Sequence, residues 1–98
     1  MKIIHDKEGK VCPIQSLVRI LSDAWTILIL RDLLITKKRF CELEKDLTGI
    51  STRTLTLKLH KLIEEGIIAH DEHYYSLTKQ GKKLAPIIKE IEKVGKKF

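Results

Sequence analysis

A glycine-containing turn between two short amphipathic helices constrains this fold more than any other feature of the sequence. The segment 39–47 predicts a helix with one apolar face, formed by Phe40, Leu43 and Leu47. Gly49 can take the positive φ that ends a helix, and Ser51 can cap the next one. The second helix, over 51–65, has a stripe formed by Leu55, Leu59, Leu62 and Ile63. Together these elements predict a helix-turn-helix.

The flanking segments extend this unit. A helix is predicted from Pro13 and another over 24–34, which Asp23 can cap and which is apolar nearly all round. After the helix-turn-helix, 67–77 predicts two short strands around a polar turn, which makes the unit a winged helix. A last helix follows, and Pro86 should kink it slightly.

We therefore predict one domain over residues 1–98, mainly α with a small β-hairpin. It would carry an N-terminal arm at 1–11 and an extra C-terminal helix at 79–97. The chain is 43% hydrophobic, and its net charge of +6 fits a polyanionic partner as well as an ordinary basic protein. No apolar run approaches the roughly 18 residues of a membrane span. The N-terminus is too polar for a signal peptide, so we expect a cytoplasmic location.

The outer face of the 51–65 helix has the chemistry of a helix that reads DNA. Its first two turns carry four hydroxyls and two cations, more than a cap requires. This end of such a helix enters the major groove, where Arg bonds guanine and Thr offers a hydroxyl and a methyl group. We predict base and backbone contacts from Ser51, Thr52, Arg53, Thr54, Thr56 and Lys58, and flanking phosphate contacts from Lys61, Lys37, Lys38 and Arg39. A solvated face with an over-supplied cap is the alternative.

Five motifs resemble one family of regulators. They are CPI at 12–14, AWTILILRDLL at 24–34, KRFCEL at 38–43, LTGISTRTLTLKLHKLIEEGII at 47–68 and YSLTKQGKKLAPII at 75–88. In this order they resemble the HxlR-type winged-helix transcription regulators of bacteria and archaea, within the MarR-like superfamily. The resemblance implies a homodimer that binds an inverted repeat in double-stranded DNA.

The chain departs from the family pattern in three places. Asp23 and Ala24 stand where Gly-Lys is common, and His60 stands where Arg is common. The predicted wing is short, and its tip is acidic at Asp71 and Glu72. Because phosphates repel carboxylates, this tip disfavours contact with the DNA backbone.

The resemblance places the dimer interface on the N-terminal and C-terminal helices. The candidate residues are Ile14, Leu17, Ile88, Ile91, Val94 and Phe98. The C-terminal stripe supports a dimer independently, because an exposed stripe of that size is a liability in a monomer. Folding back on the chain's own core is the competing expectation for Leu84 and Ile87. Two-fold symmetry would place the two reading helices about 34 Å apart.

The two cysteines are candidates for redox sensing. Cys12 aligns with a cysteine that several family members use to sense oxidants, and it precedes a helix whose dipole would stabilise a thiolate. Packing is the alternative role for Cys12. Cys41 is the weaker candidate, as a disulfide partner for Cys12 of a second chain. His70 and His73 lack further ligands at the usual spacing, so we predict no metal site.

We therefore predict a DNA-binding transcription regulator that occludes a promoter and responds to an effector that alters the spacing of its two reading helices. No catalytic triad, phosphate loop or metalloprotease motif occurs, so we expect neither an enzyme nor a cofactor. Two alternatives stay open. Leu57, on the outer face of the reading helix, favours a protein–protein interaction module on the same scaffold. The net charge of +6 permits sequence-independent coating of DNA.

Overall fold

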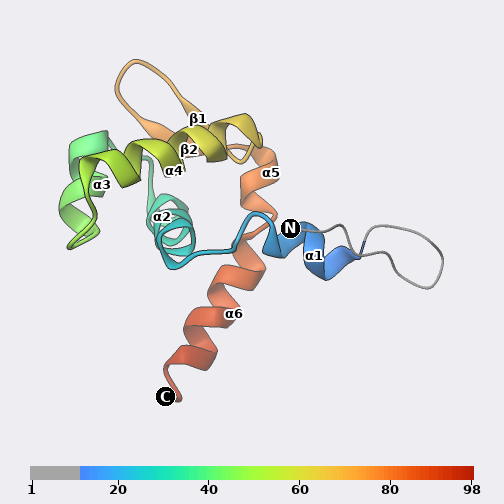
Figure 1. Ribbon diagram of the computed structural model, residues 1–98. Coiled ribbons are helices and arrows are strands. Elements are labelled where there is room, and N and C mark those ends of the chain that lie inside the picture. The colour runs from blue at the N-terminus through green and yellow to red at the C-terminus, as the bar shows by residue number, and fades with distance from the viewer. Residues whose placement is uncertain (1–11) are drawn as a thin grey trace.

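The computed structural model describes residues 12–98 and is a winged helix-turn-helix, as predicted (Figure 1). Its elements in chain order are α1 (Pro13–Val18), α2 (Ala24–Ile35), α3 (Phe40–Asp46), α4 (Thr52–Glu64), β1 (Ile68–His70), β2 (Tyr75–Leu77), α5 (Lys79–Lys82) and α6 (Ala85–Gly95). The predicted arm at 1–11 lies outside the described residues. Within the described residues, no helix is long and apolar enough to cross a membrane.

Local signals in the sequence set the ends of the elements. The side chains of Asp23, Ser51 and Thr78 each accept a hydrogen bond from an N–H group in the first turn of α2, α4 and α5 respectively. Gly49 and Gly66 have φ angles of 91° and 74°, a region that glycine enters without a steric penalty. The first of these glycines makes the turn between α3 and α4, and the second leads from α4 toward the hairpin. The caps predicted at Asp23 and Ser51 and the turn predicted at Gly49 are thus confirmed.

The core forms around α2, which contacts α4, α6 and β2. Its buried apolar residues come from nearly every element and are Ile29, Leu30, Leu33, Leu43, Leu47, Ile50, Leu55, Leu59, Leu62, Ile67, Ile68, Tyr75, Leu84 and Ile88. The antiparallel hairpin pairs Ile68 with Leu77 and His70 with Tyr75. This core fixes α4 against α2 and leaves the outer face of α4 in solvent.

The single helix expected over 79–97 is interrupted in the structure. α5 ends at Lys82, and α6 begins at Ala85. Pro86 explains the break, because it has no N–H to donate to the carbonyl of Lys82 and its ring would clash with that carbonyl in a continuous helix. After the break, α6 runs away from the helix-turn-helix, and the C-terminus lies at the end of the molecule opposite the hairpin turn (Figure 1).

Candidate nucleic-acid interface

α4 begins with the predicted cap, and its Ser51 hydroxyl makes two bonds. The Ser51 Oγ accepts the N–H of Thr54 at 3.0 Å and donates to the Thr54 Oγ1 at 2.9 Å. Thr52 donates its hydroxyl to Glu44 on α3, and Thr56 donates to the carbonyl of Thr52 at 2.8 Å. The hydroxyl surplus at this helix start is therefore partly structural. Thr52 and Thr56 have already donated their hydroxyl hydrogens, so their hydroxyl oxygens can only accept a hydrogen bond from another molecule.

The three predicted cations of α4 differ in their surroundings. Arg53 and Lys61 are exposed, and in the described part of the chain their side chains have no ion pair or hydrogen bond. Lys58 is half-buried, and its Nζ lies 2.8 Å from the Asp23 Oδ2 at the start of α2. Arg53 and Lys61 can therefore contact a polyanion directly, whereas Lys58 already has an anionic partner. The Asp23–Lys58 pair joins residues 35 positions apart, and nothing local in the sequence indicates it.

The connector between α2 and α3 forms an additional edge of the wing. The N–H of Lys38 donates to the Tyr75 carbonyl at 3.0 Å, and the Tyr75 N–H donates to the Lys38 carbonyl at 2.7 Å. Lys37 and Arg39 project over the ring of Tyr74, with the Lys37 Nζ 4.5 Å and the Arg39 guanidinium carbon 5.2 Å from its centroid. Tyr74, which we did not predict as a site residue, thus supports two predicted phosphate contacts.

Lys38 itself is turned away from this exposed pair. Its Nζ lies 2.6 Å from the Asp46 Oδ2, and only 15% of its side chain is exposed. The hydrogen bond to Asp46 is the main cause that raises the pKa of Lys38 above its usual value. Lys38 is therefore held within the chain, and Lys37 and Arg39 are the connector cations that face solvent.

The tip of the wing is acidic and well ordered by its own backbone. The Asp71 Oδ1 accepts the N–H groups of Tyr74 at 2.8 Å and His73 at 2.9 Å. These two hydrogen bonds, that from Tyr74 first, hold the pKa of Asp71 below its usual value. The carboxylate is charged near neutral pH, and this charge weakens any approach of the tip to phosphates.

The remaining candidate residues fall into two groups. Cys12, at the start of α1, is partly exposed, and Cys41, on α3, is exposed; both are free thiols. Of the predicted dimer contacts, Ile14, Leu17, Ile91, Val94 and Phe98 are exposed in the single chain. Ile88 is not, since 3% exposure places it in the core against α2; the packing of α6 on α2 covers it. Among the described residues, no cluster of three His, Cys, Asp or Glu side chains could hold a metal ion.

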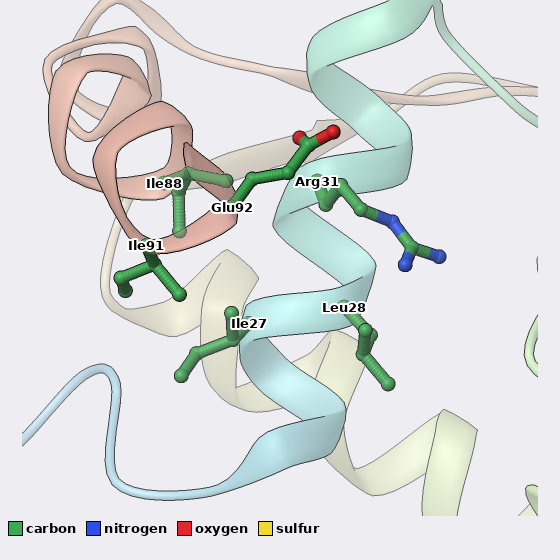
Figure 2. Close-up of a pocket in the computed structure, with 6 residues that line it drawn as sticks. All are labelled: Ile27, Leu28, Arg31, Ile88, Ile91 and Glu92. Atoms are coloured by element: carbon green, nitrogen blue, oxygen red, sulfur yellow. The ribbon is translucent and has the colours of Figure 1, made fainter. Parts of the chain in front are cut away.

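A shallow apolar groove continues the exposed surface of α6. It has a volume of about 150 Å³ and lies between α2 and α6, where Figure 2 shows its lining. The lining residues are Ile27, Leu28, Arg31, Ile88, Ile91 and Glu92. The exposed stripe and this groove together form an apolar surface on the side of α6 that does not touch the helix-turn-helix.

Comparison with known proteins agrees with this geometry. The family model described as HxlR-like helix-turn-helix matches residues 20–98. This chain belongs to that family. An HTH-type transcriptional regulator of Synechocystis is 39% identical over 89% of this chain and 70% of its own length. YvaP, an HTH-type transcriptional regulator of Bacillus subtilis, is 39% identical over 88% of this chain and 87% of its own length.

Solved structures of similar regulators share the HxlR-like fold. A chain described as a MarR-family transcriptional regulator of Porphyromonas gingivalis W83 superposes with a TM-score of 0.83, at 34% identity and over 96% of both chains. The redox regulator HypR in its reduced form gives 0.80 at 28% identity, over 88% of this chain and 92% of its own. Quinone-bound YodB of B. subtilis gives 0.80 at 28% identity, over 89% of this chain and 100% of its own. The chain is thus a transcription regulator by family, with the winged-helix fold of this group.

Proposed function

We propose that this HxlR-family chain is a sequence-specific DNA-binding regulator that acts as a homodimer on an inverted-repeat operator in the cytoplasm. The observation that carries the proposal is the outer face of α4, where Arg53 and Lys61 are exposed and unpaired in the described part of the chain. Arg53 stands at the helix end that enters the major groove in helix-turn-helix proteins. We assign Arg53 and Thr54 to base edges, and Lys61, Lys37 and Arg39 to phosphates.

The dimer would use the exposed apolar residues of α1 and the apolar surface of α6. Ile14 is 73% exposed and Phe98 is fully exposed, and Ile91 and Val94 add to the same side of α6. A partner chain that covered this surface would remove apolar area from water and bring two copies of α4 into two-fold symmetry. Half-sites about 34 Å apart would then match one turn of DNA. Bound there, the dimer would occlude a promoter.

The decisive experiment measures binding to the DNA upstream of the chain's own gene and to scrambled DNA of equal length, across a salt series. Preference for the upstream DNA at moderate salt supports the proposal. Arg53→Ala should strongly weaken that preference, because contacts to base edges carry sequence information and phosphate contacts do not. Lys61→Ala should weaken binding to both DNAs by the same factor. Lys93→Ala, on the polar face of α6, serves as the control for loss of one positive charge and should keep the preference.

Two different results would point to the alternatives. Equal affinity for both DNAs that falls steeply with salt would indicate phosphate contacts only, as in sequence-independent coating. Absence of binding at low salt would contradict DNA binding. Leu57, 56% exposed on α4, would then be the candidate contact for a protein partner, and Leu57→Asp would test it.

We also propose that the regulator responds to oxidants through Cys12, with Cys41 of the second chain as a candidate partner. Cys12 is partly exposed at the start of α1, and two structural neighbours, HypR and YodB, are named as a redox regulator and as a quinone-bound form. Hydrogen peroxide would take two electrons from two thiols, leaving an interchain disulfide and two water molecules. Peroxide should weaken DNA binding, dithiothreitol should restore it, and Cys12→Ser should be insensitive. Weakening that persists in Cys12→Ser would contradict this assignment.

A further inference from the structure

One carboxylate links the start of α2 to the outer side of α4. The Asp23 Oδ1 accepts the N–H of Thr26 at 2.9 Å, which caps α2. The Asp23 Oδ2 accepts the Thr26 hydroxyl at 3.2 Å and the Lys58 Nζ at 2.8 Å. The sequence led us to expect Asp23 only as a cap and Lys58 as a DNA contact. In the structure the two residues bond each other.

The surroundings of this pair favour its persistence. About 30% of the Asp23 side chain and 28% of the Lys58 side chain are exposed. Burial alone would raise the pKa of Asp23, but the bonds from Lys58 and Thr26 outweigh it and leave that pKa lowered. When the Lys58 cation leaves, a half-buried carboxylate such as Asp23 loses more stabilising free energy than a fully exposed carboxylate would.

Moving Lys58 to a phosphate would also leave an unneutralised carboxylate beside the DNA. Asp23 lies next to a helix that, under the proposed function, enters the major groove. Removing its cation would therefore expose the phosphates to a negative charge at short range. Arg53 and Lys61 can contact a phosphate without leaving a carboxylate unpaired, because their side chains have no anionic partner among residues 12–98.

We propose that Asp23 withholds Lys58 from the DNA, so that Lys58 is a positioning residue that fixes α4 against the start of α2. The charged contacts of α4 are then Arg53 and Lys61. This inference rests on the proposed function and refines it. It removes one predicted contact and assigns a role to the aspartate that replaces the glycine common in the family at this position.

The salt dependence of binding to a mixed-sequence duplex counts phosphate contacts without knowledge of the operator. The slope of log K against log salt is negative, and each lost contact lowers its magnitude by about 0.9, or by about 1.8 for the two copies in a dimer. Here and below, slope means this magnitude. Lys61→Ala should lower the slope by that amount. The charge-neutral double variant Asp23→Ser with Lys58→Ala leaves no unpaired carboxylate beside the DNA and should keep the wild-type value. Asp23→Ser keeps a hydroxyl that can cap α2 but frees Lys58. It should raise the slope by about as much as Lys61→Ala lowers it.

Glu65→Gln is the matched control for removal of a carboxylate that pairs with a cation. Glu65 follows the last residue of α4 and lies 3.6 Å from the Arg19 guanidinium, at the helix end away from Arg53. The salt slope of Glu65→Gln should equal that of the wild type. The double variant Asp23→Ser with Lys58→Ala should return the slope to the wild-type value, which shows that Lys58 supplies the gained contact.

Two outcomes would overturn the inference and leave the proposed function intact. A fall in slope for the double variant Asp23→Ser with Lys58→Ala equal to that for Lys61→Ala would mean that Lys58 moves to a phosphate on binding. An unchanged slope for Asp23→Ser would mean that Asp23 is not what keeps Lys58 from the DNA. A wild-type chain that fails to bind the duplex at low salt would instead contradict the proposed function, a result distinct from either slope.

Discussion

The Ser51 hydroxyl illustrates, at the scale of one residue, how a cap and a DNA contact can share a position. It accepts the N–H of Thr54 at 3.0 Å and lies at the end of α4 assigned to the major groove. Most replacements of Ser51 would therefore change both the stability of the fold and the binding of DNA. A substitution that keeps the cap changes binding alone. Aspartate does so, because it caps a helix as well as serine but carries a negative charge.

Ser51→Ala should lower the free energy of unfolding by about 1 kcal/mol, because the N–H of Thr54 loses its acceptor. Ser51→Asp should keep the wild-type stability and yet weaken binding to any duplex, because its carboxylate faces phosphates. Urea unfolding and duplex binding of the two variants measure both effects. Wild-type affinity in Ser51→Asp would place this residue outside the interface.

Asp23 gives a prediction about acid stability. Its pKa is lowered in the fold from 3.8, so its contribution to stability is complete above that value and is lost as the pH falls below it. The stability difference between wild type and Asp23→Asn should therefore be larger at pH 7 than at about pH 3. Glu64→Gln, which removes an exposed carboxylate with no side-chain bond in the described residues, should show no such change between the two pH values. A constant difference for Asp23→Asn would contradict the assignment of the lowered pKa.

Caps could be predicted residue by residue, whereas ion pairs could not. Asp23, Ser51 and Thr78 bond to N–H groups within three positions, so the sequence order already places donor and acceptor together. The partner of Lys58 depends on how α2 crosses α4, which periodicity does not specify. For the same reason Lys38 and Lys58 looked like free cations in the sequence, and the structure pairs both.

At the scale of elements, the close approach of α5 to Ile67, the residue before β1, is the tightest constraint. A Cβ added to Gly81 would lie 2.1 Å from the carbonyl oxygen of Ile67 and 3.0 Å from the Leu77 Cδ2. The same turn holds Thr78, whose hydroxyl donates to the Gly66 carbonyl at 2.6 Å. This glycine lets α5 close over the hairpin and so directs α6 away from it.

Gly81→Ala should destabilise the fold by roughly 1–3 kcal/mol, because the obstructing atom is backbone and cannot rotate away. Gly95→Ala is the matched control in α6. A Cβ there meets nothing within 4 Å, so alanine should stabilise by up to about 1 kcal/mol through its higher helix propensity. Thermal unfolding of both variants measures the contrast. Equal melting temperatures would contradict the close approach of α5 to Ile67.

Helices and strands could be predicted where apolar residues recur at a regular spacing. Features that depend on a backbone contact were missed. The stripes of α3 and α4 and the alternation in the hairpin gave the helix-turn-helix and its wing. The sequence suggested a slight kink at Pro86, but the structure has a full break between α5 and α6. The bridge between Lys38 and Tyr75 was also missed, because a single pair of backbone bonds leaves no periodic pattern in the sequence.

At the scale of the whole molecule, the apolar stripe of α6 has two ends with different roles, which the sequence pattern did not distinguish. The end of the stripe nearest Pro86 belongs to the core, since Leu84 and Ile88 are both buried. The far end, with Ile91, Val94 and Phe98, is exposed. Helical periodicity gives one continuous stripe, and only the packing of α6 on α2 shows where the core stops.

Ile91→Asp should convert the proposed dimer to a monomer, because a charge in an apolar interface has no partner there. Lys93→Asp changes the net charge by more but lies about 200° around α6, on its polar face, and should leave the dimer intact. Sedimentation equilibrium of the two variants gives the mass directly. A dimeric Ile91→Asp would exclude this part of α6 from the interface.

The exposed end of α6 has a consequence for how such a regulator would respond to its own supply. If two chains must meet to occupy one operator and most chains are single, the number of dimers follows the square of the number of chains. Doubling expression would then raise the number of dimers about fourfold while they are scarce. The exposed hydrophobic residues of α6 would thereby make occupancy of the operator depend steeply on how much of the protein the cell makes.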